Sequence, residues 1–200
     1  QKIQQMEGFM KKFMVLTALL VSGAVLAQNI HQASDDTSRG QSLVKDGTFQ
    51  VDRKQNFFGS WLANFKLLEQ NPGLVALDET VSVKDGQSIR LSNPKGPNVG
   101  LMQTVHGIKP ATKYRLSYYL KYTDINPDKV EGFGGVVLNV WHAGNKWFPA
   151  RPFTGTSDWK RHEFTYTTDA KAAPELSLSL MIINGRGTAW FDDVQMVEVK

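Results

Sequence analysis

Short runs of β-branched and aromatic residues, divided by Gly, Pro, Asn and Asp, recur from residue 43 to the end of the chain. Many short runs with turn residues between them are typical of an antiparallel sandwich or barrel. No run keeps a helical period for longer than a turn around residues 61–68. The sequence therefore predicts an all-β domain with two packed sheets. Its expected strands are residues 43–50, 74–83, 88–92, 99–105, 114–122, 135–142, 161–167, 176–183 and 188–199.

Alternation within three of these runs predicts which side chains are buried. Apolar residues occupy every second position of residues 114–122, 135–142 and 176–183, the period of a strand with one face on a core. The residues predicted to be buried are Leu116, Tyr118, Leu120, Val136, Leu138, Val140, Leu176, Leu178, Leu180 and Ile182. The opposite positions include Tyr119, Asn139 and Trp141, which we expect to share one exposed sheet face. A large exposed aromatic patch usually marks an interaction site.

The first part of the chain has the pattern of an export signal. Met10-Lys11-Lys12 precedes an apolar run that ends in Val25-Leu26-Ala27, and a basic start, an apolar run and small residues are typical of a cleaved secretory signal peptide. We expect residues 1–27 to be an upstream extension plus signal peptide, residues 28–42 a flexible lead-in, and residues 43–200 one domain. The apolar run is too short to span a bilayer comfortably, so no transmembrane segment and a secreted, periplasmic or cell-surface location are expected.

Charge and cysteine content exclude several function classes. The formal net charge is +4, and without residues 1–27 the chain has 20 basic and 18 acidic residues. Neither a Lys/Arg cluster nor a basic helix is visible, so nucleic acid is not an expected partner. The chain has no cysteine, which excludes disulfides, a thiolate nucleophile and a Cys-type zinc site.

The two ends of the predicted domain carry a family resemblance. Residues 43–50 read Leu-Val-Lys-Asp-Gly-Thr-Phe-Gln, and the last strand contains Trp190-Phe191-Asp192-Asp193-Val194. These motifs resemble the first and last strands of carbohydrate-binding modules of the family 4, 9 and 22 type, and the resemblance covers about residues 43–199. It implies a β-sandwich of the jelly-roll, galactose-binding-domain-like type and a non-catalytic module that binds polysaccharide.

Sugar binding would account for the aromatic face. Pyranose rings stack their C–H faces on Trp and Tyr, while sugar hydroxyls need amide, guanidinium or carboxylate partners. We expect Trp141 and Tyr119 to be stacking platforms. The residues expected to bind ligand with them are Asn139, Gln103, Arg90, Trp147 and Arg151. The alternative is that Trp141 is covered by residues 145–153 and that Trp147 only anchors this loop.

The other tryptophans are predicted to be structural or are left open. Trp159 lies in Gly155-Thr156-Ser157-Asp158-Trp159, which matches a stretch of the family whose Trp closes the core. We therefore expect Trp159 to be buried, and Trp190 to be packed as well. Trp61 follows an early loop that borders the ligand cleft in many such modules, so its role stays open.

The resemblance also implies a structural calcium ion between the first and last strands. In the family the ligands are backbone oxygens, the Glu of the first-strand motif and the first Asp of the last-strand pair. Asp192 keeps that Asp, whereas Thr48 stands at an Asp position and Gln50 replaces the Glu, which removes one negative charge. The alternative is that Asp192 only accepts hydrogen bonds from neighbouring backbone.

Evidence for catalysis is weak in this sequence. Asp192 and Asp193 are consecutive, so on a strand they point to opposite faces and cannot form the carboxylate pair of a glycoside hydrolase. A polysaccharide lyase using His142, Tyr119 and Arg151 is the enzymatic alternative. We expect a secreted, monomeric, non-catalytic module that binds polysaccharide. A lectin-like or adhesion domain that binds a protein or cell-surface partner is the other alternative.

Overall fold

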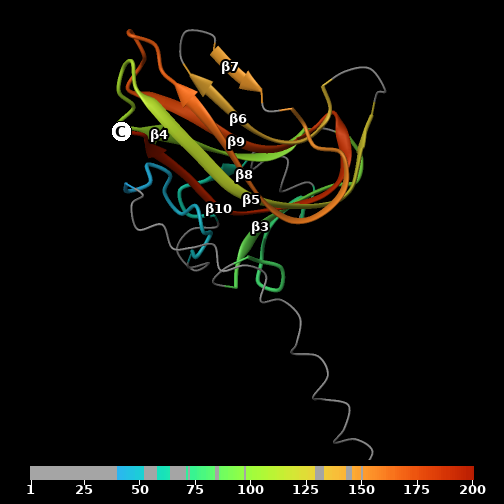
Figure 1. Ribbon diagram of the computed structural model, residues 1–200. Helices are drawn as coiled ribbons and strands as arrows, with labels where there is room; N and C mark the ends of the chain where they lie inside the picture. The colour runs from blue at the N-terminus through green and yellow to red at the C-terminus, as the bar shows by residue number, and fades with distance from the viewer. Residues whose placement is uncertain are drawn as a thin grey trace, which may run out of the picture. The chain divides into compact units, whose positions relative to one another are not determined.

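The part of the domain that the computed structural model describes is built from two five-stranded sheets. The described residues are 40–51, 58–63, 71, 73–83, 86–96, 98–128, 133–142, 146–149 and 151–200. Sheet A has the order β1 (Leu62–Ala63), β4 (Val99–His106), β9 (Glu175–Ile183), β6 (Gly135–His142) and β7 (Lys146–Pro149). Sheet B has the order β2 (Val75–Asp78), β3 (Ser88–Asn93), β10 (Gly185–Glu198), β5 (Lys113–Pro127) and β8 (Gly155–Thr167). All of their pairings are antiparallel. Figure 1 shows the two sheets stacked as layers.

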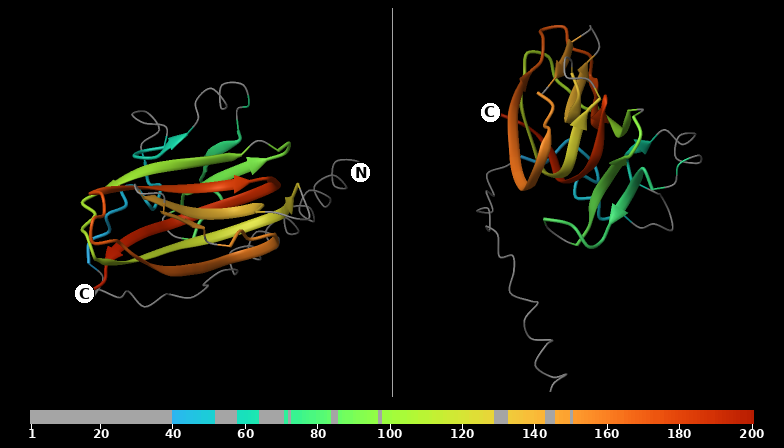
Figure 2. Two further views of the ribbon diagram at one scale, coloured as in Figure 1. Left: turned by 90° about the horizontal axis from the view of Figure 1, so that it is seen from above. Right: turned by 90° about the vertical axis from the view of Figure 1, so that its right-hand side faces the viewer.

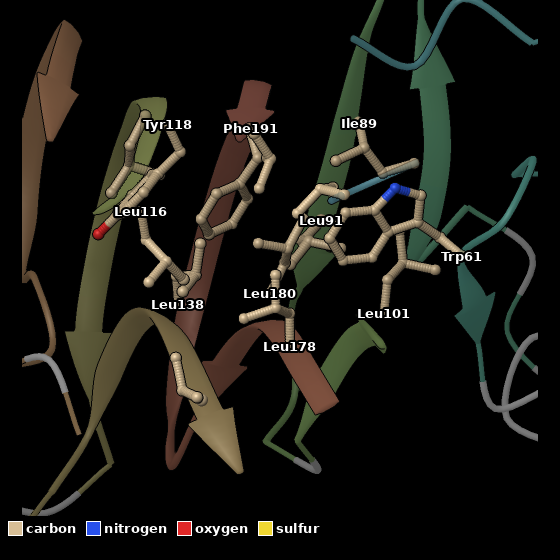
Figure 3. Packing of buried hydrophobic residues seen from close by; sticks show 14 of the residues in the cluster. Trp61, Ile89, Leu91, Leu101, Leu116, Tyr118, Leu138, Leu178, Leu180 and Phe191 are labelled. Atoms are coloured by element: carbon tan, nitrogen blue, oxygen red, sulfur yellow. The ribbon is translucent and has the colours of Figure 1, made fainter. Parts of the chain in front are cut away.

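The hydrophobic core lies between the sheets. Leu116, Tyr118 and Phe191 extend from sheet B toward Leu138 and Leu180 of sheet A (Figure 3), and these side chains are at most 2% exposed. Every residue predicted to be buried from alternation is buried, because the side chains of a strand point alternately to its two sides. The all-β jelly-roll sandwich predicted from the sequence is confirmed.

Several strand boundaries differ from the predicted ones. Residues 43–50 form bends and turns rather than a strand, although Leu43 N donates to Met196 O at 2.8 Å and Val194 N donates to Gly47 O at 2.9 Å. Two short edge strands, β1 and β7, were not expected. Edge strands pair on one side only and can be very short, so their sequences carry little alternation.

The expected leader and most of the expected lead-in lie outside the described residues. Residues Arg39–Lys200 form one compact unit by their contacts. Within the part of the chain that the structure describes, no helix is long and apolar enough to cross a bilayer.

Candidate functional site

The outer face of sheet A is the surface on which exposed apolar side chains gather. It is formed by the positions that alternate with the core residues of β4, β9 and β6, together with β1 at the edge. The left view of Figure 2 looks down onto this sheet. We call this surface the sheet A face. Its members are Leu62, Gly100, Met102, Thr104, His106, Val137, Asn139, Trp141, Glu175, Ser177, Ser179 and Met181.

Three large apolar side chains on this face are open to solvent. Leu62 is 57% exposed, Met102 is 49% exposed and Trp141 is 49% exposed. Leu62 and Met102 are cross-strand partners on β1 and β4, and Trp141 lies on β6, with β9 between β4 and β6. Apolar surface therefore flanks the central strand on both sides. Several exposed apolar side chains on one face are typical of an interaction surface.

Small hydroxyl side chains lie between the apolar ones. Ser177 pairs with Trp141 on one side and Thr104 on the other, and Ser179 pairs with Asn139 and Met102 in the next row. The side chain of Asn139 is buried, at 5% exposed, and its Oδ1 has no hydrogen-bond partner. The face therefore offers hydroxyl groups beside its apolar surface, whereas Asn139 and Val137 are buried beneath it.

Charged groups are confined to one end of the sheet A face. His106 Nδ1 lies 3.2 Å from Glu175 Oε2, and both side chains are exposed. None of the other members of this face carries a formal charge. An extended ligand on this face would therefore meet apolar surface and hydroxyl groups rather than ions.

The expectation that Tyr119 shares a face with Trp141 is wrong. Tyr119 lies on β5 of sheet B, where it pairs with Asp192 and Arg161, and its neighbours Tyr118 and Leu120 are in the core. Its side chain therefore points to the outer side of sheet B. Arg90 on β3 also lies there, opposite Trp190. Alternation shows on which side of a strand a residue lies, but it does not show to which sheet the strand belongs.

Gln103 also differs from its expected position, because it points inward. It alternates with the exposed Met102 and Thr104 and is 3% exposed. Its Oε1 accepts a hydrogen bond from Lys45 N at 2.9 Å and its Nε2 donates to Lys45 O at 2.8 Å. Gln103 is thus a buried link between β4 and residues 40–51, and both ends of its amide are already satisfied.

The residues of the alternative lyase site are not brought together. His142 is buried, with Nδ1 2.7 Å from Tyr166 Oη and Nε2 2.9 Å from Ala173 O. Its ring therefore lies on the core side of β6, whereas Tyr119 lies on the outer side of sheet B. Arg151 is exposed on the segment before β8. This arrangement contradicts a shared site for the three residues.

The remaining expected ligand residue, Trp147, lies on β7 directly opposite Trp141 in the register. Its side chain lies outside the described residues. Met102 and Leu62 were not expected on this face. Met102 had a signal, since it alternates with Val99, Leu101 and Val105, whereas Leu62 belongs to a strand of two residues and had none.

The other tryptophans have different surroundings from one another. Trp61 is 1% exposed, packs against Phe49 with ring centroids 5.7 Å apart and donates from Nε1 to Asp46 O. Trp190 is half-buried and donates from Nε1 to Asp78 Oδ2 at 2.9 Å. Trp159 is also half-buried and does not belong to the core cluster, so the expectation that it closes the core is wrong. It lies at an irregularity where β8 shifts its register against β5.

No family model matches this chain. Among curated proteins, the tRNA nuclease WapA of Bacillus subtilis (strain 168) is 26% identical over 172 residues, which is 82% of this chain. The chain spans 7% of the length of that relative. The similarity is therefore to a small segment of a much longer protein.

Several solved structures with the same architecture are carbohydrate-binding modules. The structure named Family 16 Carbohydrate Binding Module-2 superposes with a TM-score of 0.53 and 21% identity, covering 78% of this chain and 99% of that one. The CBM22-1 xylan-binding domain of Xyn10C from Paenibacillus barcinonensis gives a TM-score of 0.56 and 16% identity, covering 81% of this chain and 97% of that one. This chain has the jelly-roll fold of carbohydrate-binding modules.

The same fold also occurs in an enzyme. A cyclase from Fischerella sp. superposes with a TM-score of 0.54 and 16% identity, covering 78% of this chain and 94% of that one. Function on a shared fold is decided by the site rather than by the architecture. The sheet A face is therefore the basis for a functional assignment.

Proposed function

We propose that this domain is an exported, non-catalytic module that binds a neutral polysaccharide through the sheet A face. The observation that carries the proposal is the joint exposure of Trp141, Met102 and Leu62 on one sheet face. A single exposed apolar side chain would be ordinary, but several on one face favour a binding surface. The shared fold with carbohydrate-binding modules supports a sugar as the ligand.

The chemistry of the face fits a sugar chain. The indole of Trp141 would stack on the C–H face of a pyranose ring, and Met102 with Leu62 would cover a second apolar patch across β9. Sugar hydroxyls between these contacts would meet Ser177 and Ser179.

The lack of formal charge over most of the face favours a neutral glycan. A polysaccharide with a carboxylate on each sugar needs Arg or Lys partners to offset its desolvation. The members of the sheet A face include neither residue. The exposed cations Lys109 and Arg186 are paired with acids elsewhere, Lys109 with Glu198 and Arg186 with Asp128.

The non-catalytic part of the proposal rests on the separation of titratable side chains. His142 is engaged with Tyr166 on the core side of β6, whereas Tyr119 lies on the outer side of sheet B. The export pattern of residues 10–27 supports a role outside the cytoplasm. We propose that the domain acts as a monomer, since stacking on the sheet A face needs no second copy.

Affinity electrophoresis of the domain tests this function. Gels containing neutral polysaccharides such as xylan or β-glucan should retard the protein, whereas a gel containing polygalacturonate should not. Incubation with each polysaccharide should produce no unsaturated sugar ends that absorb ultraviolet light. Mobility unchanged in every neutral gel would reject the proposal and favour a protein partner for the same face.

A further inference from the structure

The calcium ligands that the family resemblance implies are used for other contacts in this chain. Asp192 is fully buried, and each of its carboxylate oxygens accepts a backbone hydrogen bond: Oδ2 from Val83 N at 2.8 Å and Oδ1 from Asp193 N at 2.7 Å. Hydrogen bonds to a carboxylate stabilise its charged form without a metal. The contacts of Asp192 therefore fit the hydrogen-bonding alternative stated above.

The other two expected ligands, Thr48 and Gln50, are hydrogen-bonded to each other. Gln50 is exposed, and its Nε2 donates to Thr48 O at 3.2 Å. The amide group of Gln50 therefore occupies a backbone oxygen that would otherwise be available to a cation. Ca²⁺ binds six to eight oxygens, preferably with several carboxylates among them. Here the Thr48 carbonyl already accepts a hydrogen bond, and Gln50 brings a neutral amide in place of a carboxylate.

The conformation of the last-strand acids has a local explanation as well. The register of β10 against β5 shifts between Asp192 and Gln195, and Asp193 has a φ of 46°. Asp is one of the few residues with a side chain that tolerate this left-handed conformation. Asp193 Oδ1 accepts a hydrogen bond from Gln195 Nε2 at 2.6 Å. Asp192 and Asp193 therefore suit the backbone conformation of a β-bulge at this register shift.

Residues 40–51 are instead joined to both sheets by hydrogen bonds. Gln103 on β4 holds both backbone groups of Lys45, at 2.9 Å and 2.8 Å. Leu43 N and Gly47 O bond to β10 through Met196 and Val194. Asp46 extends this set, because its Oδ2 accepts from Ser60 N and Ser60 Oγ and its carbonyl accepts from Trp61 Nε1.

We infer that this domain holds its first segment to β4 through the Gln103 clamp and to β10 through backbone hydrogen bonds, and does not need calcium. The clamp is the pair of hydrogen bonds from the Gln103 amide to Lys45. A side-chain amide that satisfies both a backbone N–H and a backbone C=O mimics the pairing of a neighbouring strand. The residues of the implied metal site therefore do not fit a structural calcium ion in this chain.

Thermal unfolding of the wild-type protein tests whether the domain needs calcium. A ligand that binds only the native state raises the melting temperature by mass action. We expect the same melting temperature with saturating calcium chloride and with excess chelator. We also expect no tryptophan-sensitised terbium luminescence. A melting temperature that rises with calcium, or terbium emission that calcium competes away, would overturn the inference.

Hydrogen exchange at the Lys45 amide tests the Gln103 clamp. Gln103→Met keeps the size of the side chain and removes both bonds, so the Lys45 amide should lose protection, and the melting temperature should fall equally in calcium and in chelator. Thr104→Ala, at the next and outward-facing position of β4, is the matched control and should keep Lys45 protected. Protection of Lys45 that is unchanged in Gln103→Met would contradict the clamp. If that variant does not fold, Gln103→Glu supplies the readout, because it keeps the acceptor for Lys45 N and loses the donor to Lys45 O. Lys45 should then stay protected while the melting temperature falls, and an unchanged melting temperature would contradict the clamp.

Discussion

Trp141 and Trp61 show that the surroundings of a side chain decide what the same residue type does. Trp61 is enclosed by the core, and its Nε1 donates a hydrogen bond to Asp46 O, so its ring contributes to packing. Trp141 keeps half of its surface in solvent on the sheet A face. Alternation predicted the outward position of Trp141 because Val136, Leu138 and Val140 are apolar. The burial of Trp61 had no comparable signal, because it precedes a strand of only two residues.

Substitution of these two tryptophans separates binding from stability. Trp141→Ala should weaken retardation in a polysaccharide gel by an amount equivalent to about 2 kcal/mol or more, as expected for an aromatic anchor, with little change in the urea midpoint. Trp61→Ala should lower the free energy of unfolding by about 3 to 5 kcal/mol, because it removes a buried aromatic ring. If Trp141→Ala is retarded as strongly as the wild type, Trp141 is not part of the binding site.

Tyr119→Ala is the control for the sheet assignment. Tyr119 lies on the outer side of sheet B, so its removal should leave retardation in the same gel unchanged. A loss comparable to that of Trp141→Ala would show that the outer side of sheet B takes part in binding.

His162 gives a pH dependence to the stability of the domain. Its ring lies between Tyr118, with centroids 5.4 Å apart, and Phe153, at 4.5 Å, and its Nε2 is buried without a partner. Burial, and then the nearby charge of Lys160, lower the pKa of His162 below its usual value of 6.5. Between pH 6.5 and the lowered pKa of His162, the unfolded chain binds the proton more readily than the folded chain. The free energy of unfolding therefore falls as the pH falls below about 6.5.

Urea unfolding at a series of pH values measures this effect. The wild type should lose stability between about pH 6.5 and the lowered pKa of His162, and His162→Phe should lose less over the same interval. Subtracting the two curves removes the contributions of the other groups. Parallel curves for the two proteins would show that His162 does not cause the loss.

Among the secondary-structure elements, close approach of two backbones requires glycine at some positions. Gly135, which begins β6, has a φ of 136°, and a Cβ there would collide with Phe153 O. Phe153 and Val136 exchange two backbone hydrogen bonds, at 2.9 and 3.0 Å, beside this contact. Gly155, which begins β8, also has a positive φ of 83°, but a Cβ there would meet no atom within 4 Å.

Alanine at these two glycines distinguishes crowding from backbone strain. Gly155→Ala should lower the free energy of unfolding by about 1 kcal/mol, the strain of a positive φ alone. Gly135→Ala should lower it by more, because the added Cβ must also displace Phe153. The urea midpoints of the two variants give the comparison, and equal losses would mean that the Phe153 contact relaxes without difficulty.

For the whole molecule, the sequence predicted the architecture better than the binding surface. Alternation in β5, β6 and β9 identified core residues, because period two depends only on local geometry. Sheet membership depends on pairing between distant strands, and for this reason Tyr119 was placed with Trp141 although they belong to different sheets. Gln103 could have been recognised as inward-facing, since it shares its alternate positions with Val99, Leu101 and Val105.

Mapping a bound polysaccharide fragment on the domain shows which sheet face binds it. Two-dimensional amide spectra of the labelled protein should be recorded during titration with an oligosaccharide of whichever neutral glycan retards it. We expect the shifted amides to cluster on β4, β9 and β6, around Met102, Ser177, Ser179 and Trp141. Shifts concentrated on β3, β10 and β5 of sheet B, with the amides of the sheet A face unmoved, would contradict this expectation.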